Sequence, residues 1–95
     1  MATPEGKLKT KITAYLKQSG IYYFRKNQVA GDKKGIPDII AIDSKGNFIG
    51  IEVKVGNNTQ SEAQKAQQRG IEKTKGIYLL AYSLQDVKDY FEGSD

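Results

Sequence analysis

Residues 35–55 read GIPDIIAIDSKGNFIGIEVKV, and the rest of the chain is organised around this stretch. Two apolar runs are joined by a short connection at residues 44–47, which is the pattern of a β-hairpin. The first run is apolar on both faces after Pro37 and Asp38, as expected for a central strand that is covered on both sides. In the second run the side chains alternate between two faces, with Ile49, Ile51, Val53 and Val55 on one face and Phe48, Gly50, Glu52 and Lys54 on the other.

This hairpin is expected to bring Asp38, Glu52 and Lys54 to the polar margin of a buried sheet. Two neighbouring carboxylates repel each other, so a fold that pairs them usually neutralises them with a cation, and their hard oxygen atoms suit Mg²⁺ or Mn²⁺. Lys54 shares a strand face with Glu52, where it can orient or activate an attacking water or stabilise charge on a phosphate. The alternative is a solvent-facing Glu-x-Lys, with Asp38 ending a turn. The complete pattern favours the metal site.

Pro37-Asp38 followed by Glu52-Val53-Lys54 resembles the PD-(D/E)xK nuclease motif. Within that superfamily the chain resembles the virus-type replication-repair nuclease (VRR-NUC) domain in its small standalone viral form. The resemblance covers nearly the whole chain and departs from the family at Glu62, where the family usually has proline. The segments that carry it are Pro4-Glu5-Gly6, Gly35-x-Pro37-Asp38, Ile51 to Lys54, Gln64 and Gly76-Ile77-Tyr78.

The length of 95 residues predicts one domain over residues 1–95, and the resemblance implies that this domain is α/β. Its restriction-endonuclease-like αβββαβ core would hold a mixed central sheet flanked by helices. The activity implied is that of a metal-dependent DNA endonuclease that acts on branched DNA such as Holliday junctions and leaves a 5′-phosphate. The small viral members act as homodimers, and two sites would suit a symmetric four-way junction.

The resemblance also implies roles for individual residues. The metal ion, Mg²⁺ or Mn²⁺, would be bound by two carboxylates and one backbone carbonyl, those of Asp38, Glu52 and Val53. The other site residues implied are Lys54, which would orient or activate the attacking water, and two assisting residues, Gln64 and Glu5.

Both assisting residues have simpler alternatives. Glu5 lies in the first turn of a predicted helix, where an acidic side chain complements the helix dipole. Gln64 follows Ser61 in the Ser-x-x-Gln pattern of a capping box, in which its side chain would satisfy a backbone N–H. A competing box begins one turn earlier, at Thr59.

The remaining sequence predicts three helices and two further strands. A helix is expected from the Thr3 cap and Pro4 to a stop at Gly20, and a strand at residues 21–25. Later elements are a helix from residue 61 to 73 or 74, a strand at 76–82 and a short helix from residue 83.

The chain contains neither cysteine nor histidine. This composition excludes disulfides, zinc sites of the Cys/His kind and histidine general bases. Any hydrolytic chemistry would therefore depend on carboxylates, lysine and a metal ion. The sequence shows no signal peptide and no apolar run long enough to span a membrane, so we expect a soluble, cytoplasmic protein.

The charge is unevenly distributed along the chain. Residues 1–35 carry eight basic and two acidic side chains, whereas the remainder carries seven basic and nine acidic ones. A basic half beside a carboxylate cluster suits an enzyme that acts on a polyanion. Candidate DNA contacts are Lys33 and Lys34 in a loop at residues 27–34 and Lys65 and Arg69 on one helical face, although a flexible connection and a solvated face are ordinary alternatives.

Two other functions stay open on the sequence alone. A nucleic-acid-binding module could keep the nuclease fold without catalysis, and a small regulator that binds a protein partner would bind no divalent metal. The intact Asp38 with Glu52-x-Lys54 favours the nuclease, because a binding module has no need of paired carboxylates that face phosphate.

Overall fold

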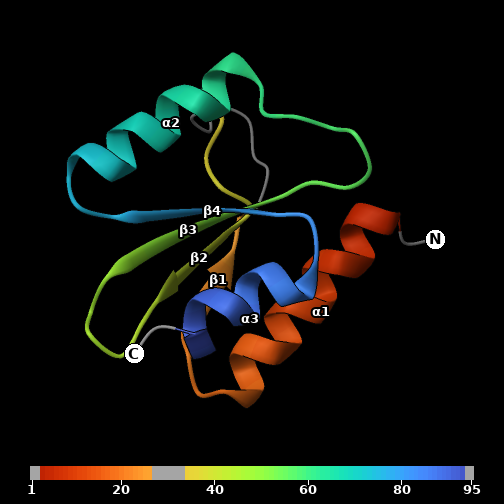
Figure 1. Ribbon diagram of the computed structural model, residues 1–95, viewed down its shortest axis with the longest axis vertical. Helices are drawn as coiled ribbons and strands as arrows, with labels where there is room; N and C mark the ends of the chain where they lie inside the picture. Colours follow the sequence, from red (N-terminus) through yellow and green to blue (C-terminus); the bar gives the residue numbers. More distant parts are fainter. Residues whose placement is uncertain (1–2, 27–33, 94–95) are drawn as a thin grey trace.

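The computed structural model describes residues 3–26 and 34–93. The elements follow the predicted order of helix, three strands, helix, strand and helix (Figure 1). Their bounds are α1 Pro4–Gln18, β1 Tyr22–Arg25, β2 Ile39–Ile42, β3 Phe48–Val53, α2 Glu62–Lys73, β4 Ile77–Ala81 and α3 Leu84–Gly93. None of these helices is both long and apolar enough to cross a membrane.

The helix caps lie where the sequence predicts them. Thr3 is the N-cap of α1, and its hydroxyl oxygen accepts a hydrogen bond of 3.0 Å from the backbone N–H of Gly6. Ser61 is the N-cap of α2 and Thr74 its C-cap, which confirms both predicted ends of that helix.

The four strands form one mixed sheet in the order β1-β2-β3-β4. β1 pairs with β2, and β2 with β3, in antiparallel orientation, whereas β3 and β4 run parallel and are joined by the crossover through α2. The hairpin between β2 and β3 therefore forms as predicted, and β2 is an inner strand of the sheet.

The turn of this hairpin is organised by the carboxylate of Asp43. Its Oδ1 accepts hydrogen bonds of 2.9 Å from the backbone N–H groups of Lys45 and Asn47. Tyr90 donates a hydrogen bond of 2.9 Å to Oδ2 and so fastens α3 to the turn. Burial acts to raise the pKa of Asp43, but the hydrogen bonds, led by those from Asn47, lower it to about 2.

The main core lies between the sheet and the pair α1 and α3, which cover the same face (Figure 1). Its fully buried apolar residues are Ile12, Leu16, Ile39, Ala41, Ile49, Ile51, Val53, Ala81 and Val87. Burying one aliphatic side chain of the larger kind stabilises the fold by about 1.5–3 kcal/mol. Because the alternate residues of β3 belong to this cluster, a slip of one residue would move them all to the opposite face.

Of the three described helices, only α2 covers the opposite face of the sheet, and α2 has no buried residue. Glycines let this helix approach the sheet closely. A Cβ atom at Gly50 would lie 2.8 Å from Cγ of Pro37, and one at Gly76 would lie 2.7 Å from Cγ2 of Ile71. These bare positions let Pro37 and Ile71 pack directly against the sheet.

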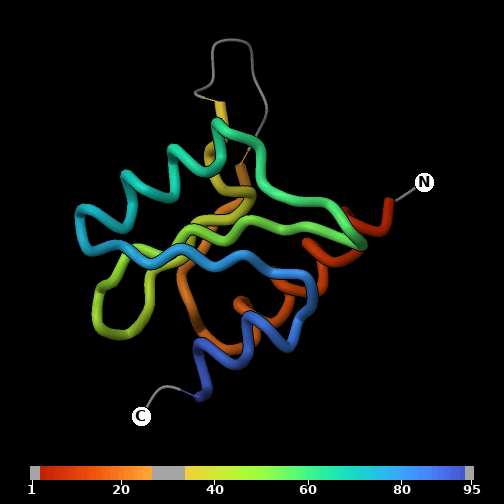
Figure 2. The backbone as a smooth tube through the Cα atoms, turned by 45° about the horizontal axis from the view of Figure 1, so that its top comes forward, coloured from red at the N-terminus to blue at the C-terminus, as the bar shows by residue number. Residues whose placement is uncertain are grey.

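Gly35 makes a still closer approach, to the backbone of the first turn of α2. Its φ is +82°, and a Cβ atom there would lie 2.4 Å from the carbonyl carbon and oxygen of Ala63. Only glycine fits this position without displacing the backbone. Figure 2 shows the resulting arrangement, in which the segment that enters β2 passes beside the start of α2.

α2 leaves part of its sheet face open. Tyr22, Phe24, Ile42 and Phe48 are between 41% and 64% exposed. The register places Tyr22 opposite Ile42 and Ile42 opposite Phe48, so three of these side chains form a row across β1, β2 and β3. The prediction that the first run is covered on both sides is thus wrong at Ile42, because α2 does not reach that end of β2.

Replacing Gly35 with alanine should destabilise the protein more than replacing Gly46 with alanine. Both glycines have a φ of +82°, so both variants carry the strain of a left-handed backbone, about 1–2 kcal/mol. Nothing lies within 4 Å of a Cβ atom at Gly46, whereas the Gly35 methyl group meets backbone atoms. We expect Gly35→Ala to lose at least about 1 kcal/mol more in urea unfolding. Equal losses would show that Gly35 does not hold α2 in place.

Candidate active site

Asp38 and Glu52 meet at one end of the β2–β3 hairpin. Ile39 pairs with Ile51, so the next position along the ladder sets Asp38 opposite Glu52. Asp38 is 9% exposed and Glu52 is 3% exposed. The structure therefore brings the predicted acid pair together and largely removes it from water.

Asp38 is held by contacts at both oxygen atoms. Its Oδ2 accepts a hydrogen bond of 2.8 Å from the backbone N–H of Val53, and its Oδ1 lies 3.2 Å from Nζ of Lys9. Lys9 also lies 3.0 Å from Oε2 of Glu5. Glu5 therefore reaches the site through the ammonium group of Lys9, and the described residues show no direct hydrogen bond from it to Asp38 or Glu52.

Lys9 is a site residue that the sequence analysis missed. Burial acts to lower its pKa, but the contacts with Glu5 and Asp38 outweigh burial and raise the pKa above its ordinary value, so the side chain is charged at neutral pH. The spacing of four residues between Glu5 and Lys9 was the available signal, because such a pair shares one helical face.

The two oxygen atoms of Glu52 have different environments. Oε2 accepts a hydrogen bond of 2.9 Å from Nε2 of Gln64 and lies 3.7 Å from Nζ of Lys54. Oε1 is buried and has no hydrogen-bond partner among the described residues. An unpartnered buried carboxylate oxygen is costly, which marks Oε1 as an atom that a bound cation would satisfy.

The pKa of Glu52 is raised to about 7. Burial is the largest cause, followed by repulsion from the neighbouring Asp38. The positive charges of Lys54 and Lys26 act in the opposite direction but do not cancel the rise. A raised pKa of this kind is typical of functional carboxylates.

Gln64 occupies both of its predicted environments at the same time. Its Oε1 accepts a hydrogen bond of 2.8 Å from the backbone N–H of Ser61, and the Ser61 hydroxyl oxygen accepts one of 3.1 Å from the Gln64 N–H, which completes the capping box. Its Nε2 donates to Glu52. The competing box at Thr59 is not used as the helix cap, because α2 begins after Ser61.

A second set of glutamines holds the connection that precedes α2. Nε2 of Gln60 donates hydrogen bonds of 2.9 Å to Oε1 of Gln68 and 3.1 Å to the hydroxyl oxygen of Tyr78 in β4. Sequence reasoning missed Gln60 and Tyr78, because their contact depends on the parallel pairing of β3 with β4.

The residues at this end of the sheet fit a hard divalent cation. Asp38 and Glu52 offer carboxylate oxygens, and Oε1 of Glu52 has no hydrogen-bond partner in the described structure. The Val53 N–H bonds to Asp38, whereas a ligand role for the Val53 carbonyl stays a prediction. The described residues contain no cluster of three acidic, histidine or cysteine side chains suited to a metal. Two carboxylates completed by a carbonyl and waters is the ligand set that Mg²⁺ commonly takes.

Three of the four predicted DNA-contact residues lie in the described part of the chain, and all three are exposed. Lys34 is exposed and precedes Gly35, and Lys65 and Arg69 are exposed on α2, where Lys65 lies 3.4 Å from Oε2 of Glu62. Neither Lys65 nor Arg69 forms an ion pair with the acid pair. Lys33 lies outside the described residues.

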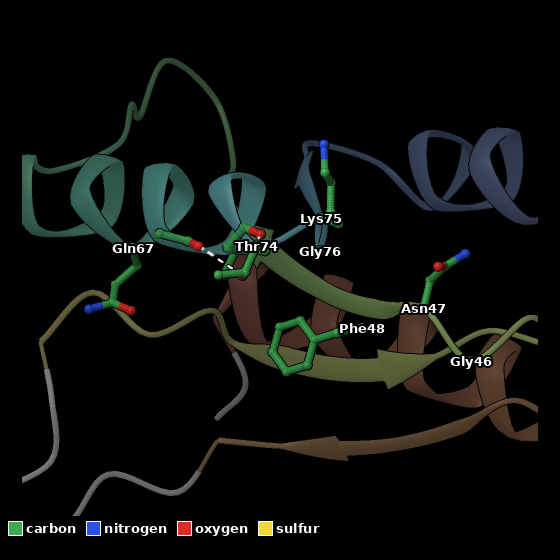
Figure 3. Close-up of a pocket in the computed structure, with 9 residues that line it drawn as sticks. Gly46, Asn47, Phe48, Gln67, Thr74, Lys75 and Gly76 are labelled. Carbon is green, nitrogen blue, oxygen red and sulfur yellow. Dashed lines mark hydrogen bonds between the residues drawn. The ribbon is translucent and has the colours of Figure 1, made fainter.

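A cavity of about 680 Å³ lies at the other end of β3 (Figure 3). Phe48 and Asn47 line it from the hairpin and Thr74 from the last turn of α2, where the Thr74 hydroxyl donates a hydrogen bond of 3.0 Å to the carbonyl of Gly70. Its lining contains no carboxylate, so it is not a candidate for metal-dependent chemistry.

The raised pKa of Glu52 predicts that metal-free protein loses stability as the pH rises. Between pH 4.5 and about 7 the native state keeps a proton that the unfolded chain releases, so the free energy of unfolding decreases with pH across this window. Glu52→Gln cannot release that proton. In EDTA we expect its stability relative to wild type to increase from about pH 5 to pH 8.

Urea unfolding at several pH values measures this difference. Glu62→Gln is the matched control, because it removes the same charge from a side chain that is 89% exposed. A stability gap between wild type and Glu52→Gln that does not change with pH would contradict the raised pKa.

Comparison with known proteins bears on the fold. No protein-family model and no curated protein sequence matches the chain. A solved structure described as a VRR_NUC domain superposes on it with a TM-score of 0.79 at 23% sequence identity, and the match covers 98% of this chain and 100% of that structure. The chain therefore has the fold of a VRR_NUC domain, as its motifs predicted.

Proposed function

We propose that the protein is a metal-dependent endodeoxyribonuclease of the VRR-NUC type. The observation that carries this proposal is the buried pair Asp38 and Glu52, with the unpartnered Oε1 of Glu52 and the ammonium group of Lys54 beside it. Burying two carboxylates side by side costs stability, and a module that only binds nucleic acid gains nothing from that cost.

Asp38, Glu52 and the carbonyl of Val53 would hold Mg²⁺ or Mn²⁺. A bound ion would neutralise the acid pair and act as a Lewis acid toward the phosphodiester. Asp38 is preoriented for this role because the Val53 N–H and Lys9 fix its two oxygens. Glu5 holds Lys9 in turn, so Glu5 is a positioning residue.

Lys54 and Gln64 would serve the reaction itself. The Lys54 side chain is 14% exposed, so its ammonium group can orient the attacking water and stabilise the charge that develops on the phosphate. Gln64 fixes Oε2 of Glu52 and leaves Oε1 free to bind. The water oxygen would form a bond to phosphorus as the bond to the 3′ oxygen breaks, giving a 5′-phosphate and a 3′-hydroxyl.

The substrate we infer is DNA, with branched structures such as four-way junctions preferred. The excess of basic residues in the first part of the chain supports a polyanionic substrate. Lys34, Lys65 and Arg69 are exposed, and none of them forms an ion pair with Asp38 or Glu52. Their side chains can therefore reach a DNA phosphate. The preference for branches rests on the resemblance of the motifs.

Cleavage of a labelled four-way junction and a matched linear duplex tests the activity. We expect cutting with Mg²⁺ or Mn²⁺, none in EDTA, and at least about a hundredfold loss of rate in Glu52→Gln and Lys54→Ala. Lys45→Ala is the matched control for lost charge, because Lys45 is exposed in the hairpin turn at the other end of β3.

Each alternative has its own signature in this assay. Equal cutting of both substrates would remove the branch preference and keep the nuclease. If the protein binds DNA tightly but does not cut it with either Mg²⁺ or Mn²⁺, the non-catalytic binding module is favoured. If it binds neither metal nor DNA, a regulator that binds a protein partner is favoured.

We further propose a homodimer that forms through the open sheet face. Tyr22, Phe24, Ile42 and Phe48 are the exposed apolar residues of this face, and none of them is charged. A two-fold contact sets the same patch against itself, so an uncharged patch avoids the self-repulsion that a charged one would suffer. Exposed aromatic groups in adjacent rows are typical of protein interfaces.

Phe24→Asp should break this dimer. We expect wild type to sediment at twice the 10.5 kDa of one chain and the variant to sediment as a monomer, with a dissociation constant raised at least about tenfold. Tyr82→Asp is the control, because Tyr82 is 40% exposed but lies beyond the end of β4. A monomeric wild type, or a dimeric Phe24→Asp, would contradict this interface.

A further inference from the structure

Lys26 extends the ladder of the edge strand β1 into the acidic site. Its backbone N–H donates a hydrogen bond of 2.9 Å to the carbonyl of Asp38, so Lys26 lies opposite Asp38 just as Asp38 lies opposite Glu52. Alternation along β1 places Lys26 on the same sheet face as Phe24 and Tyr22. This is the face that α2 leaves open over β1.

The side chain of Lys26 is held at the mouth of the site. Its Nζ donates a hydrogen bond of 3.1 Å to the carbonyl of Ile36, two residues before Asp38. Its charge also acts on the pKa of Glu52, which places the ammonium group within electrostatic reach of the acid pair. The neutral carbonyl of Ile36 therefore holds the Lys26 ammonium group near the carboxylates of Asp38 and Glu52.

The three lysines around the acid pair differ in their partners. Lys9 contacts two carboxylates, those of Glu5 and Asp38, and Lys54 lies 3.7 Å from the carboxylate of Glu52. Among the described residues, Lys26 bonds only to a carbonyl. An ammonium group has three N–H donors, and a carbonyl uses one of them without neutralising the charge. Within residues 3–26 and 34–93, no ion pair neutralises the ammonium group of Lys26, and two of its N–H donors are available to an anion.

We propose that Lys26 is a substrate-binding residue that contacts a DNA phosphate beside the scissile bond. The inference rests on the proposed DNA substrate and extends it to a residue outside the Asp38, Glu52 and Lys54 motif. The backbone carbonyl of Ile36 holds the ammonium group so that less side-chain entropy is lost when the phosphate binds. The phosphate would approach at the end of the sheet where Lys26 lies opposite Asp38, beyond Tyr22 and Phe24 of the proposed dimer contact.

Salt-dependent DNA binding separates this role from a general effect of charge. Fluorescence anisotropy of a labelled four-way junction in EDTA, at several NaCl concentrations, would compare wild type with Lys26→Gln. Gln can still donate to the Ile36 carbonyl but carries no charge. We expect binding roughly tenfold weaker at low salt and a slope of log K against log salt reduced by about 0.9.

Arg25→Gln is the matched control. Arg25 is the neighbouring residue and loses the same charge, but its pairing with Ile39 places it on the opposite sheet face. We expect less than half the slope change of Lys26→Gln, and Lys26→Arg should restore most of the affinity. Lys26→Met, which keeps the aliphatic stem, replaces the Gln variant if melting shows that the latter does not fold.

The outcomes distinguish this inference from the proposed nuclease. Equal effects of Lys26→Gln and Arg25→Gln, with wild type cutting DNA, would overturn the role of Lys26 alone. A selective loss of binding in Lys26→Gln, with wild type unable to cut, would support the phosphate contact and overturn the nuclease. Absence of DNA binding by wild type would overturn both.

Discussion

The repulsion between two buried carboxylates is the constraint on which the rest of this structure depends. Asp38 and Glu52 face each other across the β2–β3 ladder and have little water around them. The surrounding chain compensates with a backbone N–H, an amide and ammonium groups from three different elements or their extensions. Among the described residues, none of these groups reaches Oε1 of Glu52, which is the atom that the proposed metal ion would bind.

The fold supplies these groups through close backbone approaches. Gly35 admits the first turn of α2 beside the segment that enters β2, and Gly50 admits Pro37 onto the sheet. As a result Gln64 in the first turn of α2 reaches Glu52 in β3, which lies twelve positions earlier in the sequence. A bulkier residue at Gly35 would leave Asp38, Glu52 and Gln64 unchanged in sequence and yet remove the geometry that makes them a site.

Much of the fold and the centre of the site could be predicted from local patterns. Hairpin alternation, the Ser61 capping box and the placement of Asp38 opposite Glu52 each express a rule within one or two elements, whereas the site role of Gln64 came from the family resemblance. Lys26 and Tyr78 could not be found in this way, and neither could the contact of Lys9 with Asp38, because these contacts join different layers or strands joined by long connections. The exposure of Ile42 likewise depends on how far α2 extends over the sheet, and the alternation of apolar residues along a strand does not predict this.

The capping box of α2 has a consequence for dynamics. One side chain, Gln64, closes the first turn of the helix and also bonds to Glu52. α2 is the one helix of the three described that has no buried residue, and so few buried contacts lower its free energy of local opening. Fraying of that first turn would release the amide from the carboxylate at the same moment. Local unfolding of the first turn of α2 would therefore remove a hydrogen bond from the Glu52 carboxylate, which couples the acid pair to that equilibrium.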